Sequence, residues 1–488
     1  MDTPRLAALA DRLRGVVGEA AVLTDHQQLR TYECDGLAHY KSTPAIVVLP
    51  TTTAQVAGVV RACVDAQVPY VARGAGTGLS GGALPRSDGV LIVTSRMRAI
   101  REVDLANQRA VVEPGVANLD VTRAVSPHGY YYAPDPSSQQ VCSVGGNVAE
   151  NSGGAHCLKY GFTTHHVTGL EVVTPDGEVV TLGGTAAEHP GYDLLGAFIG
   201  SEGTLGIATA VTVRLTRLPE TVRTLLAGFP STDEAGAAVS AIIAAGVVPA
   251  AIEMMDALAI EAAEAAVHCN YPAGAGAVLV VELDGPEAEV ADTFAAVERH
   301  CREHGAFEIR LARDDAERAL FWKGRKSAFA AVGRISPDYI VQDGVIPRTA
   351  LPDVLRQIAE LSARSGVRVA NVFHAGDGNL HPLVLFDDAE PGQAERAEEV
   401  SGAILDICIQ QGGSITGEHG VGADKAKYMP RMFTEGDLDT MQLLRCAFDP
   451  QGLCNPGKVF PTPRLCGEVP GRRRGVHPLQ QAGLAEVF

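Results

Sequence analysis

The sequence has few aromatic residues, a deficit of basic residues and no closely spaced cysteine pair. Aromatic residues make up 5% of the 488 residues, with one tryptophan. Lysine and arginine number 40 against 58 aspartates and glutamates, a net charge of −18. Because nucleic-acid phosphates are bound by basic patches, this balance argues against nucleic acid as a partner. The ten cysteines include no CxxC pair, which argues against a zinc ribbon or an iron–sulfur cluster.

A long apolar run is also absent. The longest run, near 241–252, is interrupted by Gly246 and Pro249 and is shorter than the roughly 20 residues that span a bilayer. The first residues have the spacing of an amphipathic helix and not the apolar centre of a signal peptide. We therefore expect a cytoplasmic protein without a membrane span of its own.

Two regions of different pattern follow each other along the chain. Residues 44–218 alternate short apolar strands with helices and glycine-rich loops. After Pro219 the sequence changes to alanine-rich helices and apolar strands, which predicts an antiparallel sheet with helices on one face. The last residues, 464–488, contain three consecutive arginines among prolines and glycines, and we expect this tail to be mobile. A length of 488 residues suggests two to four domains.

Three glycine-rich segments lie in the first region, at 73–82, 144–154 and 200–207. The first contains the GxGxxG spacing of dinucleotide-binding loops, at 76–81. That motif must open a helix, whereas here Pro85 and the turn at Asp88-Gly89 lead into a strand, so a Rossmann NAD site is excluded. Each segment alone is equally well explained as a structural turn. Together they favour a large nucleotide cofactor held by backbone N–H groups.

Two histidines flank a predicted turn in the segment HAGDGNLH, residues 374–381. If Asp377-Gly378 form a two-residue hairpin turn, His374 lies directly opposite His381, close enough to share a divalent metal. Downstream, Glu418-His419 stand between glycines in GEHGVG, residues 417–422. Two imidazoles and the Glu418 carboxylate suit zinc or manganese, which leaves His419 as a general base. The alternatives are stacked or surface histidines and a structural Glu-His pair.

Six motifs now occur in a recognisable order: the first glycine loop, PDPSS (134–138), GSEGTLGI (200–207), HAGDGNLH, GEHGVG and FDP…NPGK (448–458). Together they resemble the FAD-linked D-2-hydroxyacid dehydrogenases of the vanillyl-alcohol-oxidase fold, and among them the catalytic subunits of bacterial glycolate oxidases. The resemblance implies an α+β fold. Its parts would be a PCMH-type FAD-binding domain (1–218), a ferredoxin-like cap domain (219–425) and a helical segment (426–463) that returns to the FAD domain.

The resemblance also implies which residues contact FAD. They are Arg73, Gly74, Ala75, Gly76, Thr77, Gly78, Pro134, Asp135, Ser138, Gly145, Gly146, Asn151, Ser152, Gly153, Glu202, Gly203, Gly206, Ile207 and Asn455. Some members of this fold attach FAD covalently through a histidine of the first glycine loop. Residues 74–79 contain no histidine, so we expect non-covalent FAD.

The implied reaction is oxidation of a small D-2-hydroxy acid, with His419 as the base and with a metal on His374, His381 and Glu418. Arg325 resembles the family's clamp for the substrate carboxylate. The apolar residues Phe329, Val341 and Leu383 stand where relatives that act on dicarboxylates place polar groups. A monocarboxylate such as glycolate or D-lactate is therefore expected.

The same resemblance implies partner proteins. A chain without cysteine clusters cannot pass electrons through iron–sulfur centres, so we expect a second flavin-binding subunit and an iron–sulfur subunit. Any contact with the inner face of the membrane would be peripheral and through these partners. Three alternatives stay open at this point: a D-lactate dehydrogenase that works alone, a metal-dependent hydrolase, and a flavin-binding subunit without catalysis.

Overall fold

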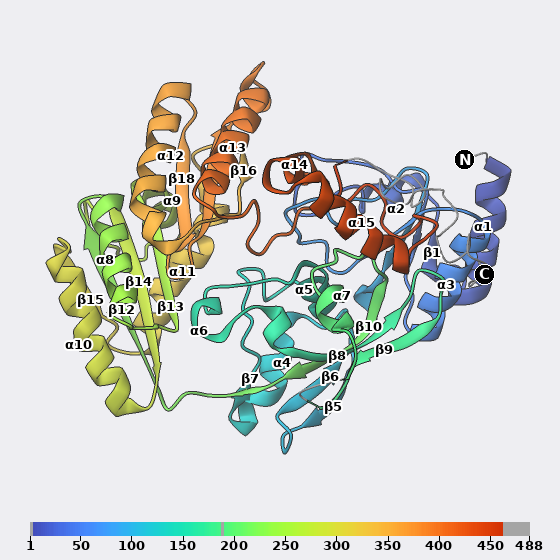
Figure 1. The fold of residues 1–488 in the computed structure, drawn as a ribbon, viewed down its shortest axis with the longest axis horizontal. Helices are drawn as coiled ribbons and strands as arrows, with labels where there is room; N and C mark the ends of the chain where they lie inside the picture. Colours follow the sequence, from blue (N-terminus) through green and yellow to red (C-terminus); the bar gives the residue numbers. More distant parts are fainter. Residues whose placement is uncertain (1–2, 187–189, 462–488) are drawn as a thin grey trace, which may run out of the picture.

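The computed structural model describes residues 3–186 and 190–461, so the tail expected to be mobile, 464–488, lies outside the described residues. Helices and strands form two lobes (Figure 1). The first lobe contains the strands before residue 218. The second, which we call the cap, is built on one large sheet whose strands run from residue 221 to 386. The predicted α+β class is confirmed.

The first lobe begins with a four-stranded sheet. Its order is β1 (Val22–Leu23), β2 (Ile46–Val48), β4 (Val90–Val93) and β3 (Tyr70–Arg73), with the last three parallel. Helices α1 (Thr3–Val17) and α3 (Thr53–Asp65) cover it, and α2 (His26–Arg30) precedes β2. Thr52 caps α3, whose Val56, Val59 and Val60 are fully buried. The first glycine loop runs from β3 to β4 without a helix, which confirms that it is not a Rossmann loop.

A five-stranded antiparallel sheet completes the first lobe. Its order is β5 (Ile100–Asp104), β6 (Arg109–Val112), β10 (Ile207–Arg214), β8 (Val167–Val173) and β9 (Val179–Gly183). The helices of this part are α4 (Asn118–Val125), α5 (Val144–Glu150), α6 (Cys157–Tyr160) and α7 (Leu194–Phe198), and the short strands β7 (Tyr130–Tyr131) and β11 (Thr216–Arg217) pair with each other. Val144 and Val148 of α5 share a core with Val172 and Val211 of the sheet. This core fixes α5 beside the start of β10.

The cap sheet has eight strands. They are β12 (Thr221–Phe229), β13 (Ala251–Asp256), β14 (Ala277–Gly285), β15 (Glu308–Leu311), β16 (Asp338–Val341), β17 (Gly344–Val345), β18 (Val369–His374) and β19 (Asn379–Phe386). The spatial order is β15-β12-β14-β13-β18-β19-β16, with β17 also paired to β19, and all pairs are antiparallel.

Helices cover both faces of the cap sheet, so the prediction of helices on one face is wrong. On one face lie α8 (Thr232–Ala244), α10 (Glu287–Glu303), α12 (Leu351–Ser365) and α13 (Gln393–Gln410); on the other lie α9 (Ala257–Val267) and α11 (Asp315–Val332). Along β12, Leu225, Ala227 and Phe229 enter the first core and Leu226 the second. The sequence of β14 explains the second layer of helices. Its residues 277–283 are all buried, and a strand whose residues are buried on both faces must have helices packed on both faces of the sheet.

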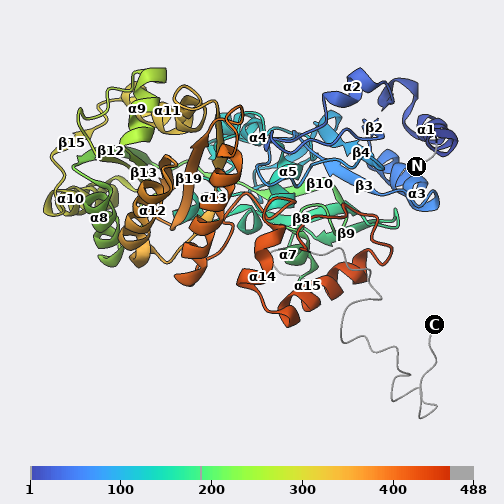
Figure 2. The same cartoon turned by 90° about the horizontal axis from the view of Figure 1, so that it is seen from above.

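The C-terminal segment lies against the first lobe (Figures 1 and 2). It contains α14 (Met429–Met432) and α15 (Glu435–Phe448). Beyond α15 the backbone pairs with β3: the Tyr70 N–H donates to Leu453 O at 2.9 Å, and the Asn455 N–H donates to Tyr70 O at 2.8 Å.

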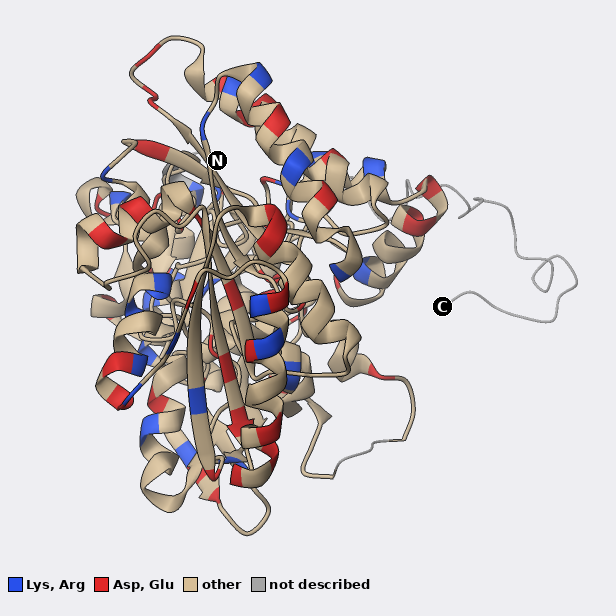
Figure 3. Ribbon diagram, turned by 90° about the vertical axis from the view of Figure 1, so that its left-hand side faces the viewer, with Lys and Arg blue, Asp and Glu red and all other residues tan. Residues whose placement is uncertain are grey.

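Acidic and basic residues are interspersed over the helices in Figure 3. Among the described helices, none is long and apolar enough to cross a membrane.

Candidate active site

A cavity of about 610 Å³ is lined by residues of both lobes. This volume is in the usual range for ligand sites. The predicted cofactor residues that line it are Arg73, Gly74, Ala75, Gly76, Thr77, Gly78, Ser138, Gly145, Gly146, Ser152, Glu202, Gly203, Gly206 and Ile207. The cap contributes Lys326 and Phe329 from α11 and Val341 from β16, and Glu418 and His419 also line the cavity. The three glycine-rich segments therefore meet at one cavity, as the sequence predicted.

Glycine allows the first loop and the segment at Pro114 to approach the start of α5 closely. A Cβ on Gly74 would lie 2.2 Å from Ser143 Oγ, and a Cβ on Gly145 would lie 2.5 Å from the Pro114 ring. Ser143 caps α5 and also accepts a hydrogen bond from the Ala75 N–H at 3.3 Å. The result is a cradle of main chain with little side-chain bulk, which suits a phosphate-bearing ligand.

Five of the predicted cofactor residues are not among those lining the cavity. Pro134 O accepts from the Asn118 amide, Asp135 bonds to His156, and Asn151 ends α5 and accepts from the Thr164 N–H. Gly153 packs against the Glu418 carboxylate. Asn455 is 1% exposed and donates its amide to Gly82 O (3.1 Å) and Glu202 O (2.6 Å). The contacts of these five residues are with other parts of the protein, and their assignment to the cofactor stays a prediction.

The histidine hairpin has a different register from the predicted one. His374 pairs with Asn379 and His381 pairs with Val372, so four residues, 375–378, lie in the turn. The prediction that His374 faces His381 directly is wrong, because the Asp-Gly pair forms only part of a longer turn. The two histidines are nevertheless diagonal neighbours on one face of the sheet, and their ring centroids are 5.0 Å apart.

Glu418 brings the two imidazoles together. Its Oε1 lies 3.3 Å from His374 Nε2 and 3.0 Å from His381 Nε2. Donor atoms that share one zinc-type ion at about 2.0–2.2 Å are separated by about 3–4 Å, so these positions fit a common metal. Glu418 Oε2 has no hydrogen-bond partner among the described residues. An unpaired buried carboxylate oxygen beside two imidazoles is the arrangement that a divalent cation would satisfy.

In both imidazoles the Nδ1 atom, which is the ring nitrogen away from Glu418, contacts another group of the protein. His374 Nδ1 lies 2.8 Å from Glu253 Oε1, and His381 Nδ1 lies 3.3 Å from Gln342 O. Contacts of this kind fix the tautomer and leave Nε2 free to bind a metal. Burial alone would lower the pKa of His374, but the Glu253 and Glu418 carboxylates raise it well above its usual value. Burial lowers the pKa of His381.

Arg325 stands behind this cluster. It is 2% exposed and its Nη2 lies 2.6 Å from Glu253 Oε2, where Glu253 is 1% exposed. Its guanidinium also lies 5.8 Å from the ring of Phe329, and that ring is 5.7 Å from the ring of His381. Glu253 therefore joins Arg325 to His374, an ion-pair chain that sequence reasoning did not find.

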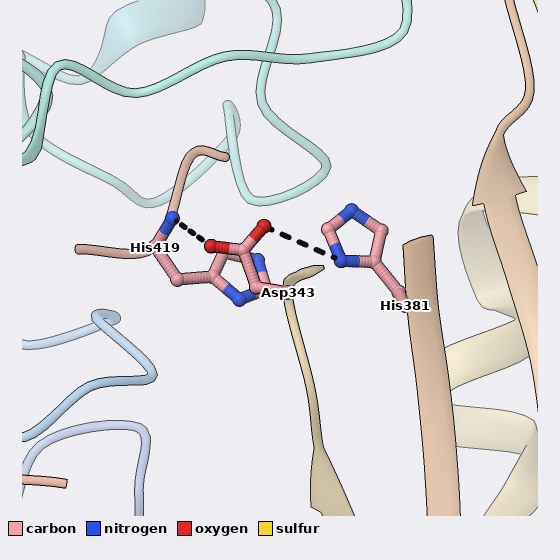
Figure 4. Close-up of side chains that lie close together, drawn as sticks. All are labelled: Asp343, His381 and His419. Atoms are coloured by element: carbon pink, nitrogen blue, oxygen red, sulfur yellow. Dashed lines mark hydrogen bonds and ion pairs between the residues drawn. The ribbon is translucent and has the colours of Figure 1, made fainter. Parts of the chain in front are cut away.

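Asp343 fixes the loop that carries Glu418 and His419. Its buried carboxylate accepts backbone N–H bonds from Gly417, Glu418 and His419 and also lies 3.4 Å from Lys425 Nζ. Burial alone would raise the pKa of Asp343, but His419 and Lys425 hold it below its usual value. Figure 4 shows this carboxylate between His419 and His381. The available sequence signal was a carboxylate two residues after the apolar end of β16.

His419 itself lines the cavity. Its ring stacks on that of His381, with centroids 4.8 Å apart and planes 14° apart, and its Nε2 lies 3.6 Å from Glu418 Oε1. Its Nδ1 has no hydrogen-bond partner among the described residues. With Asp343 and His381 it forms a second set of donor atoms within 4.8 Å of one another. His374, His381 and Glu418 are called the metal-type cluster below. The position of His419 beside this cluster and at the cavity wall suits a proton acceptor.

Two further carboxylates that line the cavity, Glu150 and Glu202, face the same loop. Glu202 accepts the N–H groups of Val421 (2.7 Å) and Gly422 (2.6 Å). A Cβ on Gly420 would lie 2.0 Å from Glu150 Oε2 and 3.0 Å from Glu202 Oε1. Burial and then the Glu202 charge raise the pKa of Glu150 well above its usual value. This pair of facing carboxylates is another feature that the sequence did not reveal.

Family models match most of the chain. Residues 44–183 match the FAD binding domain, and residues 218–459 match the C-terminal domain of FAD linked oxidases. The chain is 52% identical to glycolate oxidase subunit GlcD of Escherichia coli K12, covering 96% of this chain and 93% of the relative. It is 32% identical to a D-lactate dehydrogenase of Anaerostipes hadrus, covering 87% and 91%.

Solved structures agree on the fold. The 4-ethylphenol oxidase of Gulosibacter chungangensis superposes with a TM-score of 0.79 at 19% identity, covering 95% of this chain and 98% of that one. A p-cresol methylhydroxylase superposes with a TM-score of 0.79 at 16% identity, covering 94% and 97%. The chain belongs to the FAD-linked oxidase family. It is accordingly an FAD-binding oxidoreductase, and the resemblance seen in its motifs is confirmed.

Proposed function

We propose that this chain oxidises a small D-2-hydroxy monocarboxylate, with glycolate to glyoxylate as the principal reaction. The observation that carries the proposal is the position of the His374, His381 and Glu418 cluster beside His419, where Glu418 and His419 line the same cavity as the glycine loops. Relatives named as glycolate oxidase subunits, at 52% and 39% identity, support the substrate. The D-lactate dehydrogenase relatives support the reaction class and keep D-lactate as the second substrate.

The main-chain cradle fits FAD. Residues 74–78 and the start of α5 would hold its phosphates, and Gly203, Gly206 and Ile207 would lie along its ring system. Bound FAD supplies a two-electron acceptor that takes a hydride from the substrate carbon. We propose that the attachment is non-covalent, since residues 74–79 contain no histidine.

The cluster of His374, His381 and Glu418 fits a divalent cation, which we propose is zinc or manganese. The fit rests on donor atoms within 4.8 Å of one another, on the unpaired Glu418 Oε2 and on imidazoles anchored through Nδ1. A cation held there would polarise the substrate oxygens as a Lewis acid. The protein's own contribution is to anchor Nδ1 of each imidazole and to aim its Nε2 at Glu418.

His419 takes the hydroxyl proton of the substrate in this proposal. Its unpartnered Nδ1 and its place at the cavity wall leave it free to accept a proton, while stacking on His381 fixes its ring. Arg325 is proposed to orient the substrate carboxylate. Its Nε donates to no described residue, so donors remain after the ion pair with Glu253 is made.

The cap wall favours a substrate with one carboxylate. Phe329 and Val341 line the cavity, whereas Leu383 is fully buried in the core beneath it. A second carboxylate placed against Phe329 and Val341 would lose hydration without gaining a partner. Leu383 therefore acts only through its packing, and the two lining residues carry the discrimination.

We further propose that electrons leave through partner proteins, a second flavin-binding subunit and an iron–sulfur subunit. The relatives named as subunits support an assembly. Neither group of potential metal ligands among the described residues contains a cysteine, so this chain offers no cluster site there. Association with the inner face of the membrane would then be peripheral and would depend on those partners.

A substrate panel tests the proposed specificity. We expect kcat/KM with an artificial dye to be about 100-fold higher for glycolate or D-lactate than for D-2-hydroxyglutarate. L-Lactate should be inactive. A preference for D-2-hydroxyglutarate would contradict the assignment of Phe329 and Val341. If the assignment is right, replacing Phe329 by Arg should raise the activity on D-2-hydroxyglutarate relative to glycolate. The substitution Phe307→Arg at an exposed position is the control for added charge.

A further inference from the structure

A short segment of the FAD domain, residues 152–162, reaches across to the cap. It contains α6, and four of its side chains contact the cap. Lys159 Nζ donates to Asp284 O at 2.7 Å, and the Tyr160 hydroxyl donates to Asp284 Oδ2 at 2.6 Å. Leu158 packs on the large cap core, and His156 contacts Glu282. Asp284 and Glu282 both lie on β14, so one strand of the cap sheet receives most of these contacts.

His156 lies between two carboxylates that belong to different domains. Its Nδ1 is 2.9 Å from Asp135 Oδ2 in the FAD domain, and its Nε2 is 3.2 Å from Glu282 Oε1 in the cap. A carboxylate only accepts hydrogen bonds, so both ring nitrogens must carry protons to satisfy both contacts. The ring is therefore an imidazolium. Burial alone would lower the pKa of His156. The Asp135 and Glu282 carboxylates outweigh burial and raise the pKa of His156 to about 10, which agrees with the geometry.

Further charged groups surround this contact from each neighbouring element. From α11, Lys326 Nζ lies 3.7 Å from Asp135 and Arg318 lies 3.9 Å from Glu282. Trp322, also on α11, donates its indole N–H to Glu282 Oε2 at 2.6 Å, and its ring lies 5.5 Å from that of His156. Thr224 of β12 donates to the same carboxylate oxygen. Every oxygen of Glu282 thus has a partner, and those partners connect α6, β12 and α11.

The contact is directly connected to the active site. Helix α11 carries Trp322 at the contact, Arg325 behind the metal-type cluster, and Phe329 at the cavity wall. In the segment itself, a Cβ on Gly153 would lie 2.7 Å from Glu418 Oε2. A shift of the segment relative to α11 would therefore move the wall of the substrate site and the neighbour of Glu418 at the same time.

We propose that His156, as an imidazolium between Asp135 and Glu282, is an interdomain clamp that positions α11 and the Glu418 loop for catalysis. It is a positioning residue and not a catalytic one, because it touches neither the cavity nor the metal-type cluster. Asp135, assigned from the sequence to the cofactor, serves in this account to hold the clamp. The expected effect of the clamp on glycolate oxidation rests on the proposed function. Its expected effect on the local stability of α11 and β14 does not.

A double-mutant cycle with His156→Gln and Glu282→Gln, in the full-length FAD-loaded protein, tests the proposal. We expect His156→Gln to lower kcat/KM for glycolate by about 10- to 100-fold, since small misplacements of reacting groups have effects of that size. The FAD dissociation constant should stay within about threefold, because the residue lies outside the cavity. Adding Glu282→Gln should recover at least part of the loss, since it removes the repulsion between two facing carboxylates.

His165→Gln is the matched control. His165 is an exposed histidine close to the same segment, and its Nδ1 accepts from the Phe162 N–H within the FAD domain. That variant should retain wild-type kcat/KM. Multiplicative effects of His156→Gln and Glu282→Gln, or an activity of His156→Gln within twofold of the wild type, would overturn the clamp.

Hydrogen–deuterium exchange provides a readout that does not depend on the substrate. We expect the amides of α11 and β14 to exchange about fivefold faster in His156→Gln than in the wild type, because local opening becomes easier. Unchanged exchange there would overturn the proposal even if activity fell. If the wild type does not oxidise glycolate, the proposed function fails, and the exchange measurement still decides whether the clamp exists.

Discussion

Replacing Glu253 by Gln should destabilise the cap more than any exposed substitution. Glu253 and Arg325 are 1% and 2% exposed, and their charged atoms lie 2.6 Å apart. The amide keeps the shape of the side chain but removes the charge, which leaves the Arg325 guanidinium buried without a counter-ion. It also removes the carboxylate that accepts from His374 Nδ1 at 2.8 Å.

The size of the effect follows from the burial of both partners. Breaking a buried ion pair on one side costs about 3–5 kcal/mol, because the remaining charge stays desolvated. For a domain of about 200 residues this corresponds to a fall in Tm of roughly 6–20 °C. Loss of the contact to His374 should also weaken metal affinity by about 10- to 100-fold. Both effects have one origin, so they should appear together.

Thermal unfolding of the purified protein, followed by fluorescence, measures the stability change. The double variant Glu253→Gln with Arg325→Met should recover most of the lost Tm, because an apolar side chain in place of the buried charge is close to neutral. It should not recover activity if Arg325 orients the substrate. Glu289→Gln on the exposed face of α10 is the control and should change stability by less than about 0.5 kcal/mol. A Tm of Glu253→Gln within 2 °C of the wild type would refute the reasoning.

Three further predictions concern the metal, the base and pH. Chelation should abolish activity, and added zinc or manganese should restore it. Elemental analysis of His381→Ala should find far less than one ion per chain. Full activity with no bound metal would exclude the metal site. His419→Gln should bind FAD and metal normally but reduce the flavin about 10²- to 10⁴-fold more slowly in stopped-flow traces, and an unchanged rate would exclude His419 as the base. His156 has a folded pKa of about 10 against an ordinary value of 6.5, so its stabilising effect is fully present below about pH 6.5 and is lost as the pH rises through 10. The Tm of the wild type should therefore fall toward that of His156→Gln between pH 7 and pH 10.5, and parallel Tm profiles of the two proteins would contradict the assignment.

The sequence predicted the ligand-bearing parts well because they depend on local patterns. Glycine spacing, together with Pro85 before β4, excluded a Rossmann site, and the structure has no helix there. The order of the motifs identified the family. His374, His381 and Glu418 were correctly placed together even though the hairpin register was wrong, because directly opposed and diagonal residues share one face of a sheet.

The missed residues depend on contacts between distant segments. Glu253 lies 121 residues before its partner His374 and stands among apolar residues of β13, where no local pattern indicates that partner. Asp343 acts on a loop 74–76 residues later through backbone groups that no side-chain pattern reveals. Helices on both faces of the cap sheet were missed for a related reason, since a run of buried residues does not say which helices cover it.

Anaerobic reduction of the bound flavin tests the central proposal most directly. The purified protein is mixed with glycolate without oxygen or any acceptor, and the visible absorbance of oxidised flavin is recorded. We predict stoichiometric bleaching by glycolate, bleaching by D-lactate but not by L-lactate, and bleaching at least 100-fold slower in His419→Gln. A yellow, metal-loaded protein that no 2-hydroxy acid bleaches would contradict the account.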